Sequence, residues 1–163
     1  KVYGILFDGA WLWEEYINSL IGDTFYHPMN KSGTGAQRLF GGGIGLIYPD
    51  FIGRNQADRV IADAKYKPID NIGNKDYLQV LAYLFRFDSK RGYYIYPDAK
   101  DTGTVSLMMN EGSTYEGNVS ARTDISITKL GLMIPGEAKN YKEFKRQIEV
   151  NEMAFLKSIK VTV

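Results

Sequence analysis

Hydrophobic residues recur at helical spacing in three stretches of the chain. Residues 10–21 follow Asp8-Gly9, a favourable helix start, and end before Gly22. Residues 75–88 repeat the helical pattern, and so do residues 140–159, where Asn140 with Glu143 resembles a capping box. At about 100° per residue, the first helix has an apolar face of Leu12, Trp13, Tyr16, Ile17 and Leu20. The last helix has a stripe of Tyr141, Phe144, Ile148 and Phe155.

Shorter apolar runs between these helices predict strands. Residues 44–52 and 59–66 flank a polar turn at 55–58 and are expected to form a hairpin. Further strands are expected at 92–96, where Pro97-Asp98 ends the run, at 104–109 and at 124–134. The glycine-rich stretch 27–43 is typical of a loop and lacks the Walker phosphate-binding pattern. This order of elements, without repeats or a linker, predicts one α/β domain over residues 1–163.

The predicted hairpin carries the most informative polar residues. Alternation along a strand puts Asp63 and Lys65 on one face of an otherwise apolar run, and an unpaired buried charge is costly. Either the two form a structural ion pair, or Asp63 binds a metal beside a cation that holds a water molecule. Asp50, after Pro49 on the adjacent strand, can converge with Asp63. Two carboxylates and the Ala64 carbonyl would form an all-oxygen Mg²⁺ site.

Both flanking helices offer polar residues to this hairpin. Gln79 and Tyr83 are four residues apart and share a face of the second helix. They belong to a polar stripe that is either solvated or functional, and its other members are Lys75, Asp76, Arg86 and Lys90. Glu14 lies at the edge of the first helix's apolar face, whereas Glu15 lies on its polar side. Glu14 is therefore expected to be the half-buried acid of the two, either an ordinary surface residue or a metal ligand, acting through water.

Composition and charge limit the kinds of site and the class of protein that this chain can be. The 163 residues are 44% hydrophobic and 24% charged, which is typical of a soluble globular protein, and no apolar run is long enough to span a membrane. There is one His and no Cys, which excludes zinc fingers, iron–sulfur clusters and His-rich metal sites. The net charge is +1, but residues 31–91 hold ten Lys and Arg against six acids. The lack of Cys suits a cytoplasmic protein. Because the chain begins at Lys1 rather than Met, we expect a C-terminal fragment of a longer protein.

These motifs together resemble the PD-(D/E)xK nuclease superfamily. The signature here is Pro49-Asp50 followed by Asp63-Ala64-Lys65, and Gln79-Val80-Leu81-Ala82-Tyr83 resembles the Gln-x3-Tyr element of RecB-like members. With Trp13-Glu14-Glu15-Tyr16 upstream, residues 7–96 are most similar to the nuclease domain of McrC-type restriction subunits. The resemblance implies a restriction-endonuclease-like α/β core, with a mixed central sheet flanked by helices. Tyr48 departs from the pattern, because related nucleases often have a basic residue before Pro-Asp.

The resemblance also implies roles for the site residues. Mg²⁺, with Mn²⁺ as a substitute, would be bound by Asp50, Asp63 and the Ala64 carbonyl, with Glu14 assisting. Lys65 would orient the attacking water and offset phosphate charge. Gln79 and Tyr83 would position the site or the DNA backbone. Weaker candidates for phosphate contacts are Lys67, Lys75 and Arg86.

Several functional hypotheses remain open at this point. The leading one is a Mg²⁺-dependent endonuclease subunit of an McrBC-like system, cytoplasmic and driven by a partner AAA+ NTPase. It would act as a dimer or in tandem, because double-strand cleavage needs two active sites. The alternatives are a self-sufficient restriction or repair nuclease of the same fold, an inactive DNA-binding or assembly module, and an unrelated α/β binding domain.

Overall fold

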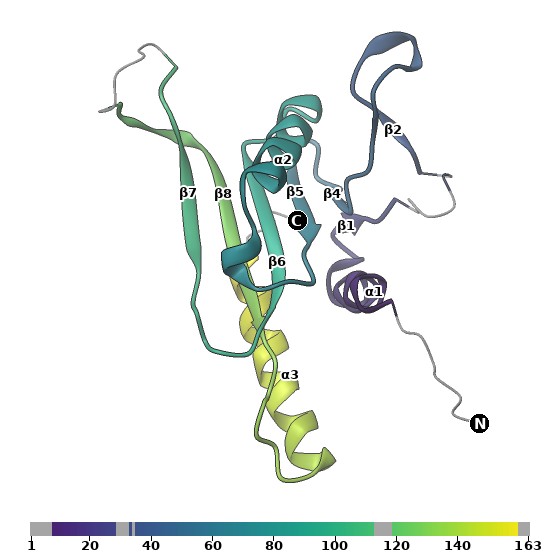
Figure 1. Cartoon of the computed structure of the whole chain (residues 1–163). Helices are drawn as coiled ribbons and strands as arrows, with labels where there is room; N and C mark the ends of the chain where they lie inside the picture. The colour runs from purple at the N-terminus through teal and green to yellow at the C-terminus, as the bar shows by residue number, and fades with distance from the viewer. Residues whose placement is uncertain (1–7, 29–32, 34, 113–118, 160–163) are drawn as a thin grey trace, which may run out of the picture.

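A six-stranded mixed sheet forms the centre of the computed structural model, which describes residues 8–28, 33, 35–112 and 119–159 (Figure 1). Its order is β1-β4-β5-β6-β8-β7. The β5–β6 and β6–β8 pairs are parallel and the other three are antiparallel. In chain order these strands are β1 (Phe25–Tyr26), β4 (Phe51–Gly53), β5 (Val60–Ala64), β6 (Arg91–Asp98), β7 (Val105–Asn110) and β8 (Ala121–Met133). Two short strands, β2 (Gln37–Arg38) and β3 (Leu46–Ile47), pair separately.

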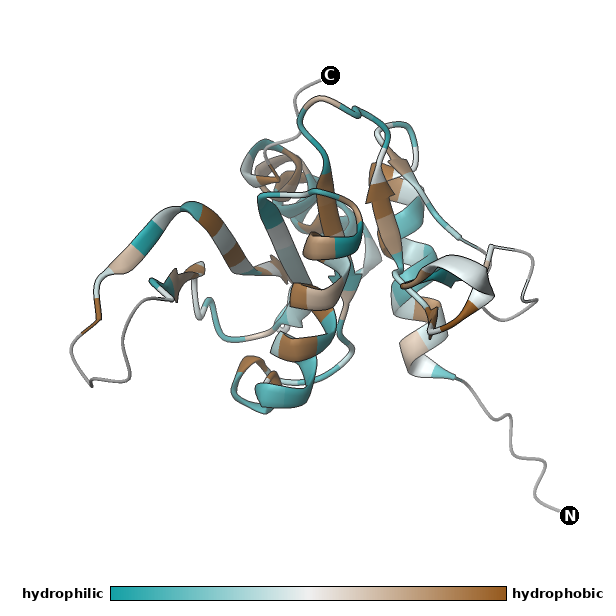
Figure 2. Ribbon diagram, turned by 90° about the horizontal axis from the view of Figure 1, so that it is seen from above, coloured by the Kyte–Doolittle hydropathy of each residue, from teal (hydrophilic) through white to brown (hydrophobic). Residues whose placement is uncertain are grey.

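Helices cover both faces of the large sheet. Helices α1 (Gly9–Ile21) and α3 (Tyr141–Ser158) share one hydrophobic core with the sheet, through Trp13, Ile17 and Phe155. Helix α2 (Asn74–Arg86) packs on the other core, through Val80 and Leu84. Figure 2 shows hydrophobic positions on the central strands between these helices, and the β7–β8 hairpin extending away from them. The predicted arrangement of a mixed sheet flanked by helices is confirmed. Over the described ranges, no helix has both the length and the apolar character needed to cross a membrane.

The β5–α2–β6 crossover determines which residues meet at the end of β5. The chain leaves β5 after Ala64, passes through a short 3₁₀ turn at Ile69–Asn71 and enters α2 beyond Gly73. The first turn of α2 therefore lies close to the carboxyl end of β5, which carries Asp63 and Lys65. In antiparallel register, Phe51 of β4 lies opposite Ala62 of β5. Asp50, one residue before β4, is consequently close to Asp63.

The prediction of one continuous strand over residues 44–52 was wrong. Two short strands, β3 and β4, replace it, and they belong to different sheets. Gly45 has φ +73°, a left-handed conformation that closes the β2–β3 turn, and Pro49 has no N–H for a ladder hydrogen bond. The predicted loop over 27–43 contains β2, and its residues 29–32 and 34 lie outside the described ranges. The break leaves Asp50 outside the ladder, with its side chain free to turn to β5.

One further boundary and one apolar stripe also differ from the prediction. Strand β6 continues through Pro97 to Asp98 because it remains paired with β8 there. On its other side β5 ends opposite Ile95, so a proline is tolerated beyond that point. The Ile95 carbonyl points towards β5, because it accepts a hydrogen bond from Lys65 N–H at 2.8 Å. Pro97, two residues later in β6, faces the same side, where β5 has ended. No strand there needs a backbone N–H from Pro97. In α3, Phe155 is buried as predicted, but Tyr141 is 79% exposed, so the apolar stripe does not extend to the first turn.

Candidate active site

Asp50 and Asp63 converge where β4 and β5 meet. Asp50 Oδ2 accepts a hydrogen bond from Ala64 N–H at 2.8 Å, which fixes this carboxyl against β5. Burial, then the nearby charges of Asp63 and Glu14, raises the pKa of the Asp50 carboxyl well above its usual range. The two acids therefore form a desolvated pair, and the convergence that the sequence predicted for them is confirmed.

The Asp63 carboxylate is buried and paired with Lys65. Its residue is 1% exposed, and burial raises its pKa although Lys65 opposes that shift. Lys65 Nζ lies 2.5 Å from Asp63 Oδ2. Apart from this ion pair, Oδ2 has no hydrogen-bond partner among the described residues. A carboxylate oxygen can accept more than one hydrogen bond, so this buried oxygen keeps acceptor capacity for a further ligand.

Helix α2 holds Lys65 from the opposite side. Gln79 Oε1 accepts from Lys65 Nζ at 3.3 Å, and Gln79 Nε2 donates to the Tyr83 hydroxyl at 2.7 Å. Tyr83 is 2% exposed and thus orients the Gln79 amide so that its oxygen faces the lysine. The predicted shared face of Gln79 and Tyr83 is confirmed. Because Asp76 and Tyr83 of the polar stripe are buried, that stripe is not simply a solvated helix face.

Glu14 reaches the same region from α1. It is half-buried, with its side chain 22% exposed against 44% for Glu15, as the sequence predicted. Its Oε1 lies 3.6 Å from His27 Nε2, while the other ring nitrogen of His27 lies 2.9 Å from the Asp50 carbonyl oxygen. His27 thus bridges the Glu14 and Asp50 segments. Among the described residues, no three His, Asp or Glu side chains lie together as a metal-binding group.

The three candidates for phosphate contacts have different surroundings. Lys67 Nζ donates to Asp76 Oδ2 at 2.7 Å and is therefore already paired. Arg86 Nε donates to the Arg38 carbonyl at 2.5 Å, linking α2 to the β2–β3 hairpin. Lys75 is exposed in the first turn of α2. Of these cations, Lys75 is the most available to an external anion.

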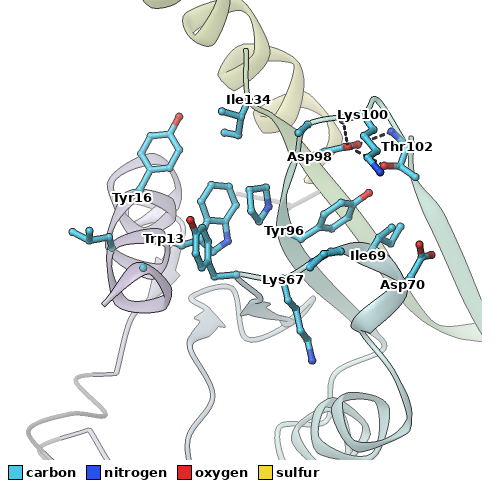
Figure 3. Close-up of a pocket in the computed structure, with 16 residues that line it drawn as sticks. Trp13, Tyr16, Lys67, Ile69, Asp70, Tyr96, Asp98, Lys100, Thr102 and Ile134 are labelled. Carbon is cyan, nitrogen blue, oxygen red and sulfur yellow. Dashed lines mark hydrogen bonds between the residues drawn. The ribbon is translucent and has the colours of Figure 1, made fainter. Parts of the chain in front are cut away.

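A cavity of about 730 Å³ lies beyond the carboxyl ends of β5 and β6, between α1 and the loop after β5 (Figure 3). Of the predicted site residues, only Lys67 lines it. The Tyr16 hydroxyl on its wall donates to Glu152 at 2.6 Å, and Asp98 accepts hydrogen bonds from the loop that follows it. Because neither Asp50 nor Asp63 lines it, this cavity is separate from the carboxylate pair.

Comparison with known families fits this arrangement of residues. The model of the McrBC 5-methylcytosine restriction system component matches residues 1–97, more than half of the chain. The chain belongs to the McrBC family. The matched part of this McrBC-family chain runs from α1 almost to the end of β6 and contains every candidate site residue, whereas β7, β8 and α3 lie beyond it. No curated protein is significantly similar to the chain.

Two residues around the Asp50–Asp63 pair were not assigned to a site from the sequence. Asp76 contacts both Lys65 and Lys67, and His27 lies between Glu14 and Asp50. The spacing of Asp76 three residues before Gln79 puts both on one helix face, and this signal could have identified Asp76. No comparable local signal marks His27, because its neighbours come from distant parts of the chain.

Proposed function

We propose that this restriction-system component is a metal-dependent DNA endonuclease domain with a PD-(D/E)xK core. The observation that carries the proposal is the buried Asp50–Asp63 pair, in which Asp63 Oδ2 is paired with Lys65 at 2.5 Å and has no further partner among the described residues. Structural ion pairs are normally completed by hydrogen bonds, because an incompletely satisfied buried charge is costly. A pair left in this state is better explained by a cation that it is built to bind.

The donor set suits a hard divalent cation. Asp50 and Asp63 provide carboxylate oxygens, and the N–H and carbonyl of a strand residue point to the same side. Since Ala64 N–H is directed at Asp50, the Ala64 carbonyl faces that side too. Mg²⁺ prefers such an all-oxygen set together with several waters, and Mn²⁺ accepts it. Glu14, turned towards His27, would assist through one of those waters rather than as a direct ligand.

The residues around the pair fit phosphodiester hydrolysis. The cation, when bound, would lower the pKa of a water and polarise the scissile phosphate. Lys65, held by Gln79, is placed to orient the attacking water and to offset the charge that develops on the phosphate. Tyr83 fixes the Gln79 amide. Lys75 is our first candidate for a DNA phosphate contact, and Lys67 and Arg86 follow because both have protein partners.

Membership of a restriction-system family supports a partner for this domain. We propose that an AAA+ NTPase motor subunit selects the DNA site in the cytoplasm, and that two copies of the domain act together to cut both strands. This chain's positive excess lies in residues 31–91, which hold ten Lys and Arg against six acids. Such an excess supports modest intrinsic affinity for DNA, with the partner supplying the remainder.

Plasmid cleavage tests this function. We expect the chain, mixed with its motor partner and NTP, to nick or linearise plasmid DNA in Mg²⁺ or Mn²⁺, and to lose that activity in excess chelator. Cleavage without partner or NTP would instead favour a self-sufficient nuclease of the same fold. DNA binding without cleavage, in the presence of either metal and the partner, would contradict the enzyme and favour an inactive binding module.

A further inference from the structure

The first turn of α2 brings an additional carboxylate, Asp76, to the lysines that follow β5. Asp76 is 8% exposed. Its Oδ2 accepts hydrogen bonds from Lys67 Nζ at 2.7 Å and from Gly73 N–H at 3.0 Å, and its Oδ1 lies 3.4 Å from Lys65 Nζ. One buried carboxylate therefore contacts both lysines and also caps the helix that carries Gln79.

Lys65 is held between two elements by this arrangement. Its ammonium has three hydrogens and three oxygen neighbours: Asp63 at 2.5 Å from β5, and Gln79 at 3.3 Å and Asp76 at 3.4 Å from α2. A cation bound by Asp63 would compete with Lys65 for the same oxygen. Asp76 Oδ1 and Gln79 Oε1 are separate from the oxygen that would bind the cation. These two residues therefore keep Lys65 at the site with or without a bound cation.

We propose that Asp76 is a positioning residue for Lys65, and that it also withholds Lys67 from DNA by pairing with it. The proposal rests on the proposed nuclease function. This proposal predicts opposite effects of Asp76 on turnover and on DNA affinity, which a purely structural role would not predict. Loss of the Asp76 charge leaves Lys65 held from α2 by Gln79 alone, which lowers turnover. It also frees Lys67, which adds a positive charge for DNA.

Asp76→Asn tests this, because it keeps the shape of the side chain and its ability to cap α2. We expect kcat for DNA cleavage to fall about 10–100-fold, as for other residues that orient a catalytic group. The metal-free dissociation constant for DNA, at one fixed salt concentration, should stay the same or become tighter. Asp76→Glu retains the charge and should recover most of kcat. The control Asp70→Asn removes the same charge from an exposed neighbouring position and should leave kcat unchanged.

A second readout does not depend on activity. In the metal-free protein, reductive methylation of Lys65 and Lys67, followed by peptide mass spectrometry, should be faster in Asp76→Asn than in Asp70→Asn, because the paired ammonium is protected. Unchanged lysine reactivity would overturn the proposal. So would a loss of kcat that Asp76→Glu does not restore, or one that comes with weaker DNA binding and a lower melting temperature. If the wild-type protein cleaves no DNA, the nuclease function fails, whereas the methylation rates still decide whether Asp76 holds both lysines.

Discussion

Asp63→Asn is expected to lower the rate of DNA cleavage by about a thousandfold. The change removes a ligand charge from a metal that supplies several kcal/mol of transition-state stabilisation, and about 4 kcal/mol corresponds to three orders of magnitude in rate. The side chain keeps its shape in a site where Asp63 is 1% exposed, so the fold should be retained. A cleavage assay with wild type and variant, at equal protein and metal concentrations, measures the loss.

The same substitution should stabilise the metal-free protein at neutral pH. Burial raises the pKa of Asp63 above its value in the unfolded chain, so the folded state holds the proton more tightly. Stability from this group is therefore greatest at low pH and declines as pH rises through the unfolded pKa, near 4, towards the folded pKa. Asn removes that decline, so denaturant unfolding should favour the variant at pH 7 and not below pH 4.

Asp88→Asn is the matched control for both measurements. Asp88 is exposed after α2 and has φ +51°, a conformation that Asn tolerates as well as Asp. The control loses the same charge and should cleave DNA at the wild-type rate. Equal cleavage by Asp63→Asn and wild type, or an equal loss in Asp88→Asn, would contradict the role given to Asp63.

Lys65→Met is expected to reduce both activity and stability. Cleavage should fall about a hundredfold or more, because the positioned charge that offsets the transition-state phosphate is removed. Removing one partner of a buried ion pair costs about 3–5 kcal/mol, and we expect the lower end because the Lys65 side chain keeps 17% exposure. The free energy of unfolding from denaturant titration measures the second effect.

The double variant Lys65→Met/Asp63→Asn separates these two effects. Once Asp63 is neutral, the loss of Lys65 no longer leaves that buried charge without a counter-ion, so most of the lost stability should return. Activity should not return, because both functional groups are absent. A double variant as unstable as Lys65→Met alone would show that Lys65 stabilises the fold through packing. Full activity in Lys65→Met would contradict its catalytic role.

The sequence was sufficient to predict the elements that carry the site. Helix α1, strand β5 and helix α2 were expected within two residues of their observed bounds, because each has a clear hydrophobic period or an apolar run. The alternation in β5 likewise placed Asp63 and Lys65 on one face, and their side chains are in contact. The spacing of Gln79 and Tyr83 predicted that they would share a helix face, and these two side chains form a hydrogen bond.

Features that depend on packing between distant segments could not be predicted in the same way. The spacing of Asp76 places it on the helix face of Gln79, but its burial follows from how the crossover packs α2 against β5. His27 meets Glu14 and the Asp50 carbonyl only after β1 has paired with β4. The break at Pro49 depends on β3 joining β2 rather than the main sheet. Local sequence patterns do not predict such contacts between segments that are far apart in the chain.

Calorimetric titration of Mn²⁺ and Mg²⁺ into the metal-free chain tests the central claim most directly, since it asks whether Asp50 and Asp63 hold a divalent cation. We predict binding to the wild-type protein, accompanied by a rise in its melting temperature, and loss of both effects in Asp63→Asn but not in Asp88→Asn. Absence of binding to the wild-type protein, or equal binding by Asp63→Asn, would contradict a metal site at this pair.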